Sequence, residues 1–85
     1  MGIVNRVVPA PELGAATDAL ARSLAAGPVL ALRNVKRLVR ESMARTLSEQ
    51  LRAEAASFGA CTATGDFVEG VTAFLATRPP QFGRD

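Results

Sequence analysis

Four basic residues cluster in one segment of the sequence: Arg33, Lys36, Arg37 and Arg40. The apolar residues of that segment recur at helical spacing and leave the basic ones on the opposite face. Such a stripe could bind the phosphates of a cofactor or a nucleic acid, but the solvated face of an amphipathic helix is the commoner case. Because no aromatic side chains are interleaved for bases to stack on, we expect no nucleic-acid partner.

Side chains that could move a proton or attack an electrophile are scarce. The chain has no histidine, which excludes a histidine general base. Cys61 falls near the end of a predicted helix, where the helix dipole disfavours a thiolate, so we expect it to serve packing. The glutamates on polar helical positions are interpreted as solvated surface: Glu41, Glu49, Glu54 and Glu69. The sequence therefore predicts no catalytic residue.

Metal and phosphate motifs are also missing from the sequence. One cysteine and no histidine leave no cluster for a zinc site, so we expect no metal and no tightly bound cofactor. The stretch FGACTATGDF lacks the GxxxxGK[ST] pattern of a phosphate-binding loop, and a turn between helices accounts for its two glycines. With no long apolar run and no secretory signal, we expect no membrane span and a cytoplasmic location.

The size and composition of the chain limit its core. Its 85 residues make one small domain at most, which would bury only about 60–65% of the surface of the unfolded chain. Alanine supplies much of the hydrophobic share, and there are four Phe but no Trp or Tyr. This composition favours helices over a deep core.

The first residues, MGIVNRVVP, differ from the rest. Ile3, Val4, Val7 and Val8 are β-branched and precede a proline, which is typical of a strand. No other segment looks like its partner, and each backbone group buried without a partner costs about 1–3 kcal/mol. We therefore expect an extended segment over residues 1–9 whose pairing is open.

The remaining residues, 10–85, predict about four short amphipathic helices. The first lies in PAPELGAATDALARSLAAGP and ends at Gly27 and Pro28, and Pro28 is suited to be the first residue of the second, PVLALRNVKRLVRESM. The third begins at Thr46, three residues before Glu49, which is the spacing of a capping box. The predicted fold class is all-α.

The fourth helix lies in TGDFVEGVTAFLATRPP. Thr64 is its expected N-cap, because a threonine oxygen can accept from the backbone of the first turn. Arg78 falls near its end, where a cation is favoured, and Pro79 and Pro80 are expected to stop it.

The ordered series GIVNRVVP, LALRNVKRLVRES, TLSEQLRAEAASF and ATGDFVEGVTAFLATRPPQF resembles the C-terminal third of the enoyl-CoA hydratase/isomerase (crotonase) family. The resemblance implies that residues 1–9 are the cut edge of a missing spiral core. That core would hold the acyl-CoA substrate and stabilise an enolate-like anion through an oxyanion hole. Residues 10–85 would be the helical region that builds a trimer or hexamer and helps to close the CoA pocket.

The resemblance also implies two contacts with CoA. Phe58 falls where family members place an aromatic residue near the bound CoA. The family often carries a lysine where this chain has Thr77, so Arg78 is the neighbouring cation that could approach a CoA phosphate. The chain alone is expected to be inactive. The alternative interpretation is a free-standing small helical module for protein–protein interaction.

Overall fold

The computed structural model describes residues 2–83, and all the regular secondary structure in that range is helical. This confirms the predicted all-α class with four α-helices. In chain order the elements are η1 (Ala10–Glu12), α1 (Leu13–Ala25), α2 (Val29–Glu41), η2 (Ser42–Ala44), α3 (Leu47–Thr62) and α4 (Gly65–Leu75).

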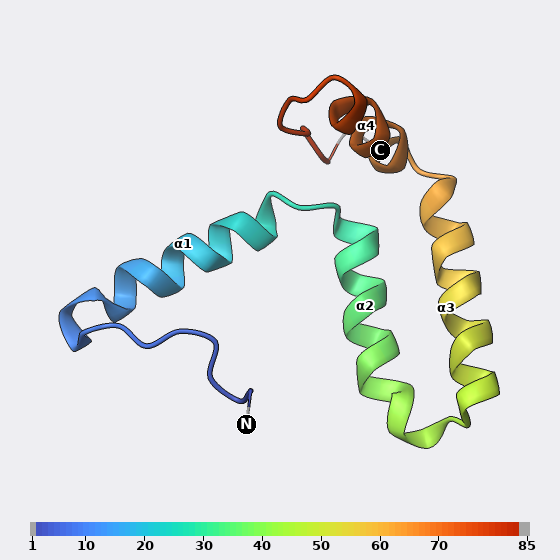
Figure 1. Ribbon diagram of the computed structural model, residues 1–85, viewed down its shortest axis with the longest axis horizontal. Coiled ribbons are helices and arrows are strands. Elements are labelled where there is room, and N and C mark those ends of the chain that lie inside the picture. Colours follow the sequence, from blue (N-terminus) through green and yellow to red (C-terminus); the bar gives the residue numbers. More distant parts are fainter. Residues whose placement is uncertain (1, 84–85) are drawn as a thin grey trace.

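Helices α2 and α3 form an antiparallel hairpin, joined by η2 (Figure 1). The predicted capping box fixes the start of α3. The Thr46 Oγ1 accepts from the Glu49 N–H at 3.2 Å, and the Glu49 Oε2 accepts from the Thr46 N–H at 3.4 Å. These bonds satisfy two backbone donors that a helix start otherwise leaves without partners.

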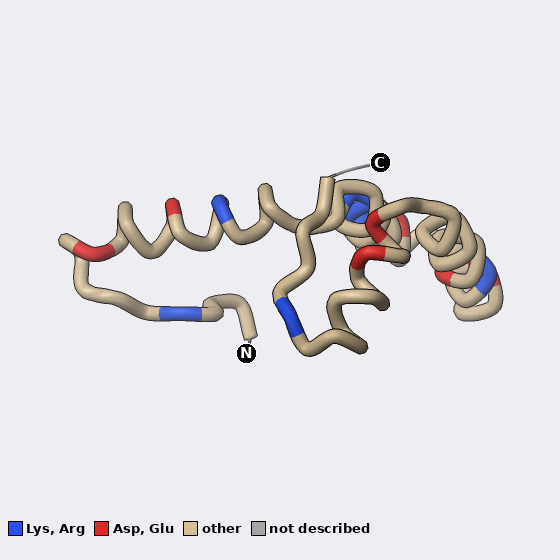
Figure 2. The backbone as a smooth tube through the Cα atoms, turned by 90° about the horizontal axis from the view of Figure 1, so that it is seen from above, with Lys and Arg blue, Asp and Glu red and all other residues tan. Residues whose placement is uncertain are grey.

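Helices α1 and α4 lie outside this hairpin. Helix α1 leads away from it and buries none of its residues. The N-terminal segment runs back alongside α1 (Figures 1 and 2). Helix α4 follows the end of α3, and its start is capped as predicted, because the Thr64 Oγ1 accepts from the Phe67 N–H at 3.2 Å.

The chain is open and flat (Figure 2). Its radius of gyration is 16.1 Å, against about 12 Å for a compact domain of this length. Its accessible surface is 7001 Å², against about 4,800 Å² for a compact monomer of this mass. Within the described residues Ala73 is the one buried hydrophobic residue, whereas Phe74 is 83% exposed. The helices thus do not enclose a core of their own.

The strand composition of residues 2–8 does not produce a strand. Residues 2–9 carry neither helix nor strand, and the side chain of Val7 is 89% exposed. The strand-like composition therefore produces an unpaired segment: no strand exists within residues 2–83, so the backbone of residues 2–9 has no sheet partner there. Met1, the first residue of the extended segment expected over residues 1–9, lies outside the described residues.

The predicted end of α4 at Pro79 and Pro80 is also wrong, since the helix ends at Leu75. Thr77 adopts a left-handed conformation, with φ of 53°. The N–H of Arg78 donates to the Ala73 carbonyl at 3.0 Å and that of Thr77 to the Phe74 carbonyl at 3.2 Å. This pair of bonds is a Schellman motif, which ends the helix before the prolines are reached.

At the start of α2 the difference is smaller. Pro28, predicted to be the first helical residue, is the N-cap, so α2 begins one residue later, at Val29. Gly27 is closely packed there: a Cβ at this position would lie 2.9 Å from the Leu32 Cδ1, so a larger residue would displace the Leu32 side chain. Gly27 and Pro28 do separate α1 from α2, as predicted.

Candidate functional site

A cluster of hydrogen-bonded polar side chains lies where α4 meets the residues that follow it. The Arg78 guanidinium binds the Glu69 carboxylate through both terminal nitrogens, with Nη1 at 2.7 Å from Oε2 and Nη2 at 3.1 Å from Oε1. The Nη1 also donates to the Pro79 carbonyl at 3.2 Å. A two-point pair of this kind fixes the plane of the guanidinium as well as its position.

This pairing affects the charge of Arg78. The hydrogen bonds that Arg78 donates to Glu69 raise the pKa of the Arg78 guanidinium above its ordinary value, and the negative charge of Glu69 adds to the effect. Arg78 therefore carries its positive charge at neutral pH. Its side chain is 42% exposed, so the cation is accessible from solvent.

Residues 79–83 form a C-terminal strap that folds back onto α4. The Gln81 N–H donates to the Glu69 Oε2 at 2.7 Å, and the Gly83 N–H donates to the Asp66 Oδ1 at 2.8 Å. Asp66 is buried, so its carboxylate is held away from water. Two acidic side chains of one helix thus anchor the strap at two points.

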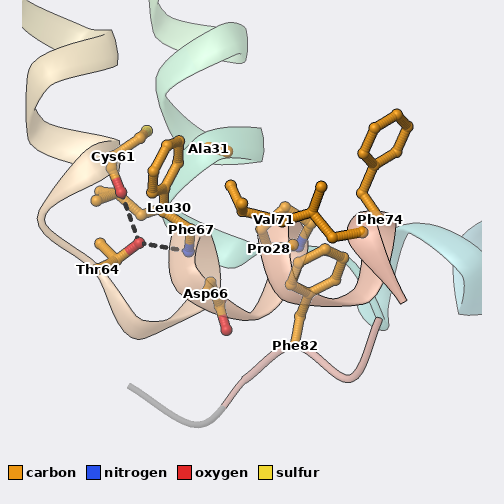
Figure 3. Close-up of a pocket in the computed structure, with 12 residues that line it drawn as sticks. Pro28, Leu30, Ala31, Cys61, Thr64, Asp66, Phe67, Val71, Phe74 and Phe82 are labelled. Carbon is orange, nitrogen blue, oxygen red and sulfur yellow. Dashed lines mark hydrogen bonds between the residues drawn. The ribbon is translucent and has the colours of Figure 1, made fainter. Parts of the chain in front are cut away.

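An apolar cavity of about 380 Å³ lies among the start of α2, the end of α3 and α4, and the strap contributes Phe82 to its lining (Figure 3). Phe82 reaches from the strap to α4, and its Cε1 lies 3.6 Å from the place where a Cβ on Gly70 would be. The remaining walls come from the start of α2, the end of α3 and α4: Pro28, Leu30, Ala31, Cys61, Thr64, Asp66, Phe67, Val71, Phe74 and Leu75. No local pattern in the sequence predicts this cavity, because its lining residues come from segments far apart in the chain.

Phe58, predicted to contact CoA, lies on α3 with 65% of its surface exposed. Its ring meets that of Phe67 edge to face, with centroids 6.3 Å apart and planes at 88°. Phe67 in turn lines the apolar cavity. Within residues 2–83 no hydrogen bond, ion pair or ring contact joins Phe58 to Arg78, so the structure does not bring the two predicted site residues together.

The other polar candidates divide into two groups. The basic stripe of α2 lies exposed: Arg33, Lys36, Arg37 and Arg40. Glu69, interpreted from the sequence as solvated surface, instead accepts hydrogen bonds from Arg78 and from the strap, and its side chain is only 21% exposed. That interpretation was wrong for Glu69, because the partner is nine residues away around the end of the helix, outside any helical spacing.

Cys61 is half-buried and lines the apolar cavity. The Asn34 amide donates to its Sγ at 3.8 Å, and the Thr64 Oγ1 donates to its carbonyl at 2.7 Å. Neither partner is a cation that would stabilise a thiolate, so this environment agrees with the predicted packing role.

A metal site and a membrane-spanning helix are both absent from residues 2–83. Within residues 2–83 no three His, Cys, Asp or Glu side chains are grouped so as to hold a metal ion. In the same range, no helix has the length and apolar character needed to cross a membrane.

Comparison with known sequences gives consistent matches over nearly the whole chain. The sequence model of the family described as enoyl-CoA hydratase/isomerase matches residues 1–85. A probable enoyl-CoA hydratase of Mycobacterium bovis is 38% identical over 81 residues, and a crotonyl-CoA hydratase of Syntrophomonas wolfei is 37% identical over 82. The matches cover 95% and 96% of this chain but 32% of each relative.

Solved structures give the same result. The chain superposes on an enoyl-CoA hydratase from a Polaromonas species with a TM-score of 0.90 and 34% identity, over 96% of this chain and 32% of that structure. A second enoyl-CoA hydratase structure, from Geobacillus kaustophilus, gives a TM-score of 0.87 with 40% identity, over 99% of this chain and 33% of that one. The arrangement of the four helices is therefore that of one third of these larger proteins.

Proposed function

Since the chain belongs to the enoyl-CoA hydratase/isomerase family, we propose that it is the C-terminal helical region of an enzyme that hydrates or isomerises an acyl-CoA in fatty acid metabolism. The names of its relatives cover both reactions, as crotonyl-CoA hydratase and as 1,2-epoxyphenylacetyl-CoA isomerase of Escherichia coli. Its sequence offers no catalytic residue, so we assign the chemistry to the parts of such an enzyme that these residues do not include.

Within that enzyme, we assign this region to assembly of a trimer or hexamer and to closure of the CoA pocket. The observation that carries this assignment is the accessible surface of 7001 Å². It exceeds that of a compact monomer by about 2,200 Å², whereas a standard protein interface takes only about 800 Å² from each partner. The excess is large enough for contacts with both the spiral core and a neighbouring copy.

The apolar residues that we expect in these contacts are exposed or line the rim of the cavity. They are Leu32, Leu51, Phe67, Phe74 and Leu75, between 36% and 83% exposed. Surfaces of this size and character rarely stay uncovered in soluble proteins. Their distribution over α2, α3 and α4 supports more than one interface.

We further propose that Phe58 and Arg78 contact CoA. Phe58 presents an exposed ring that is fixed from one side by Phe67, and such a ring suits the adenine or pantetheine portion. Arg78 presents an accessible cation beside Thr77, where the family often has lysine. No tightly bound cofactor is part of the proposal, since acyl-CoA enters as substrate.

The test is a comparison of the complete protein with the isolated chain of 85 residues. We expect the complete protein to sediment as a trimer or hexamer and to hydrate crotonyl-CoA or isomerise a 3-enoyl-CoA. We expect the isolated chain to do neither reaction. Turnover by the pure isolated chain would show that the chemistry was assigned to the wrong part.

A different result would favour the alternative function. If the complete protein is a monomer that binds no acyl-CoA, the exposed helix faces serve a free-standing interaction module instead. We also propose a cytoplasmic location, which fractionation of the native cells would test.

A further inference from the structure

The way in which Glu69 holds Arg78 leaves one edge of the guanidinium available. Glu69 takes the end of the group, where Nη1 and Nη2 point in the same direction, and the second proton of Nη1 points to the Pro79 carbonyl. An arginine has five N–H donors. The Nε–H and one Nη2–H have no partner within residues 2–83, and these two form the parallel pair on the side edge.

That side edge suits an oxyanion. Two parallel N–H donors match two oxygens of a phosphate or a carboxylate, and the pairing is stronger when the acceptor is charged. In an acyl-CoA the oxyanions are the phosphates. The end of the guanidinium, which would otherwise offer the same geometry, is already taken by Glu69. A phosphate that approaches Arg78 can therefore make a two-point contact only with the Nε–H and the remaining Nη2–H.

The residues that fix Arg78 are themselves anchored. The Schellman motif at Thr77 turns the chain so that Arg78 faces back along α4. The strap beyond it is tied to Glu69 through the Gln81 N–H and to Asp66 through the Gly83 N–H. Because the Arg78 side chain is already held in place without a ligand, binding loses less conformational entropy than it would with a mobile side chain.

We propose that Glu69 is a positioning residue, which holds the end of Arg78 so that its side edge binds one phosphate group of acyl-CoA. The inference rests on the proposed function and adds to it the residue that orients the cation. The negative charge of Glu69 opposes the attraction for phosphate, so the proposal requires that orientation outweigh this repulsion. The proposal therefore predicts that removing the charge of Glu69 weakens the binding of acyl-CoA.

The test measures binding of butanoyl-CoA, butanoyl-dephospho-CoA and butanoyl-pantetheine to the complete protein by titration calorimetry. These thioesters are saturated and are not hydrated during the titration. We expect Glu69→Gln and Arg78→Gln each to weaken binding of butanoyl-CoA by about tenfold. Binding of butanoyl-pantetheine, which has no nucleotide phosphates, should stay within about twofold. The double variant should lose no more than Arg78→Gln alone.

A matched control is Glu54→Gln, the same change on α3, where the carboxylate accepts from the Gln50 side chain at 3.2 Å. It should leave all three affinities unchanged. The dephospho ligand separates the sources of the phosphate: if it binds as weakly to the unmodified protein as butanoyl-CoA binds to Arg78→Gln, the contact is with the 3′-phosphate. If it binds as well as butanoyl-CoA, the contact is with the diphosphate.

Several outcomes would overturn the proposal. Unchanged or tighter binding of butanoyl-CoA by Glu69→Gln means that orientation does not outweigh repulsion. Equal losses for all three ligands mean that Glu69 only supports the fold. Should Glu69→Gln not fold, Arg78→Lys decides, because it keeps the charge beside Glu69 but lacks the two-donor edge, and full affinity in that variant overturns the proposal. If no ligand binds the unmodified protein, the proposed function itself has failed.

Discussion

The ring of Phe82, in the C-terminal strap, lies against Gly70 in the middle of α4, and its Cε1 is 3.6 Å from the position that a Cβ would take there. This distance is an ordinary van der Waals contact, so Gly70→Ala should fit without moving the ring. Since alanine costs less backbone entropy than glycine in a helix, we expect about 0.5–1 kcal/mol of added stability. Urea unfolding of the complete protein measures it.

Two further variants complete this experiment. Gly59→Ala, on α3 with no atoms near the new methyl group, should stabilise by a similar amount. Gly70→Val should displace Phe82 and speed hydrogen exchange at the strap amides of Gln81 and Gly83. Destabilisation by Gly70→Ala, with Gly59→Ala behaving as expected, would show that the ring sits closer than the structure has it.

The capping box of α3 gives a second prediction. Thr46→Ala removes the oxygen that accepts from the Glu49 N–H, and should cost about 1 kcal/mol in the free energy of unfolding. Ser48→Ala is the matched control, because Ser48 is exposed in the same turn and its change should be close to neutral. Equal effects of the two variants would mean that the cap contributes nothing.

The residue in left-handed conformation after α4 gives a third prediction. Thr77 is β-branched and has φ of 53°, a conformation that costs such a residue about 1–2 kcal/mol and costs glycine little. We expect Thr77→Gly to raise the melting temperature of the complete protein. Thr72→Gly, in the interior of α4, should lower it. A fall in both variants would show that the Thr77 side chain makes stabilising contacts across an interface.

The exposed end of α4 gives a fourth prediction. Phe74 is mostly exposed, so in the proposed assembly it should lie in a subunit or domain contact. Phe74→Asp should weaken association by about 2 kcal/mol or more, which is roughly thirtyfold, as measured by sedimentation velocity over a range of concentrations. Thr72→Asp places the same charge on the same helix at an exposed polar position. If both variants assemble like the unmodified protein, this face is not an interface.

Local signals were sufficient to predict the helices. Thr46 and Thr64 cap α3 and α4 through bonds that reach only three residues along the chain, so a short sequence window contains the cause. Gly27 and Pro28 separate α1 from α2 for the same kind of reason. The all-α class followed from these starts and stops together with helical periodicity.

The features that the sequence did not predict depend on contacts between residues that are far apart in the chain. Glu69 and Arg78 are paired around the end of a helix, and that end is set by Thr77, a residue that rarely adopts the left-handed conformation. The cavity is walled by residues from three helices, and Phe82 joins its lining because the strap folds back. The N-terminal segment shows the converse, because its composition is typical of a strand but a strand also needs a neighbouring strand to pair with.

The open, flat shape of the helices has a thermodynamic consequence. A chain that encloses no core gains little free energy of unfolding from its own helices, because most of its large apolar side chains stay exposed. In the proposed assembly these side chains would be buried against other copies, and the melting temperature would then rise with protein concentration by mass action. A destabilising substitution in α4 would then be compensated by expression level, in a way that substitutions in a self-contained domain are not.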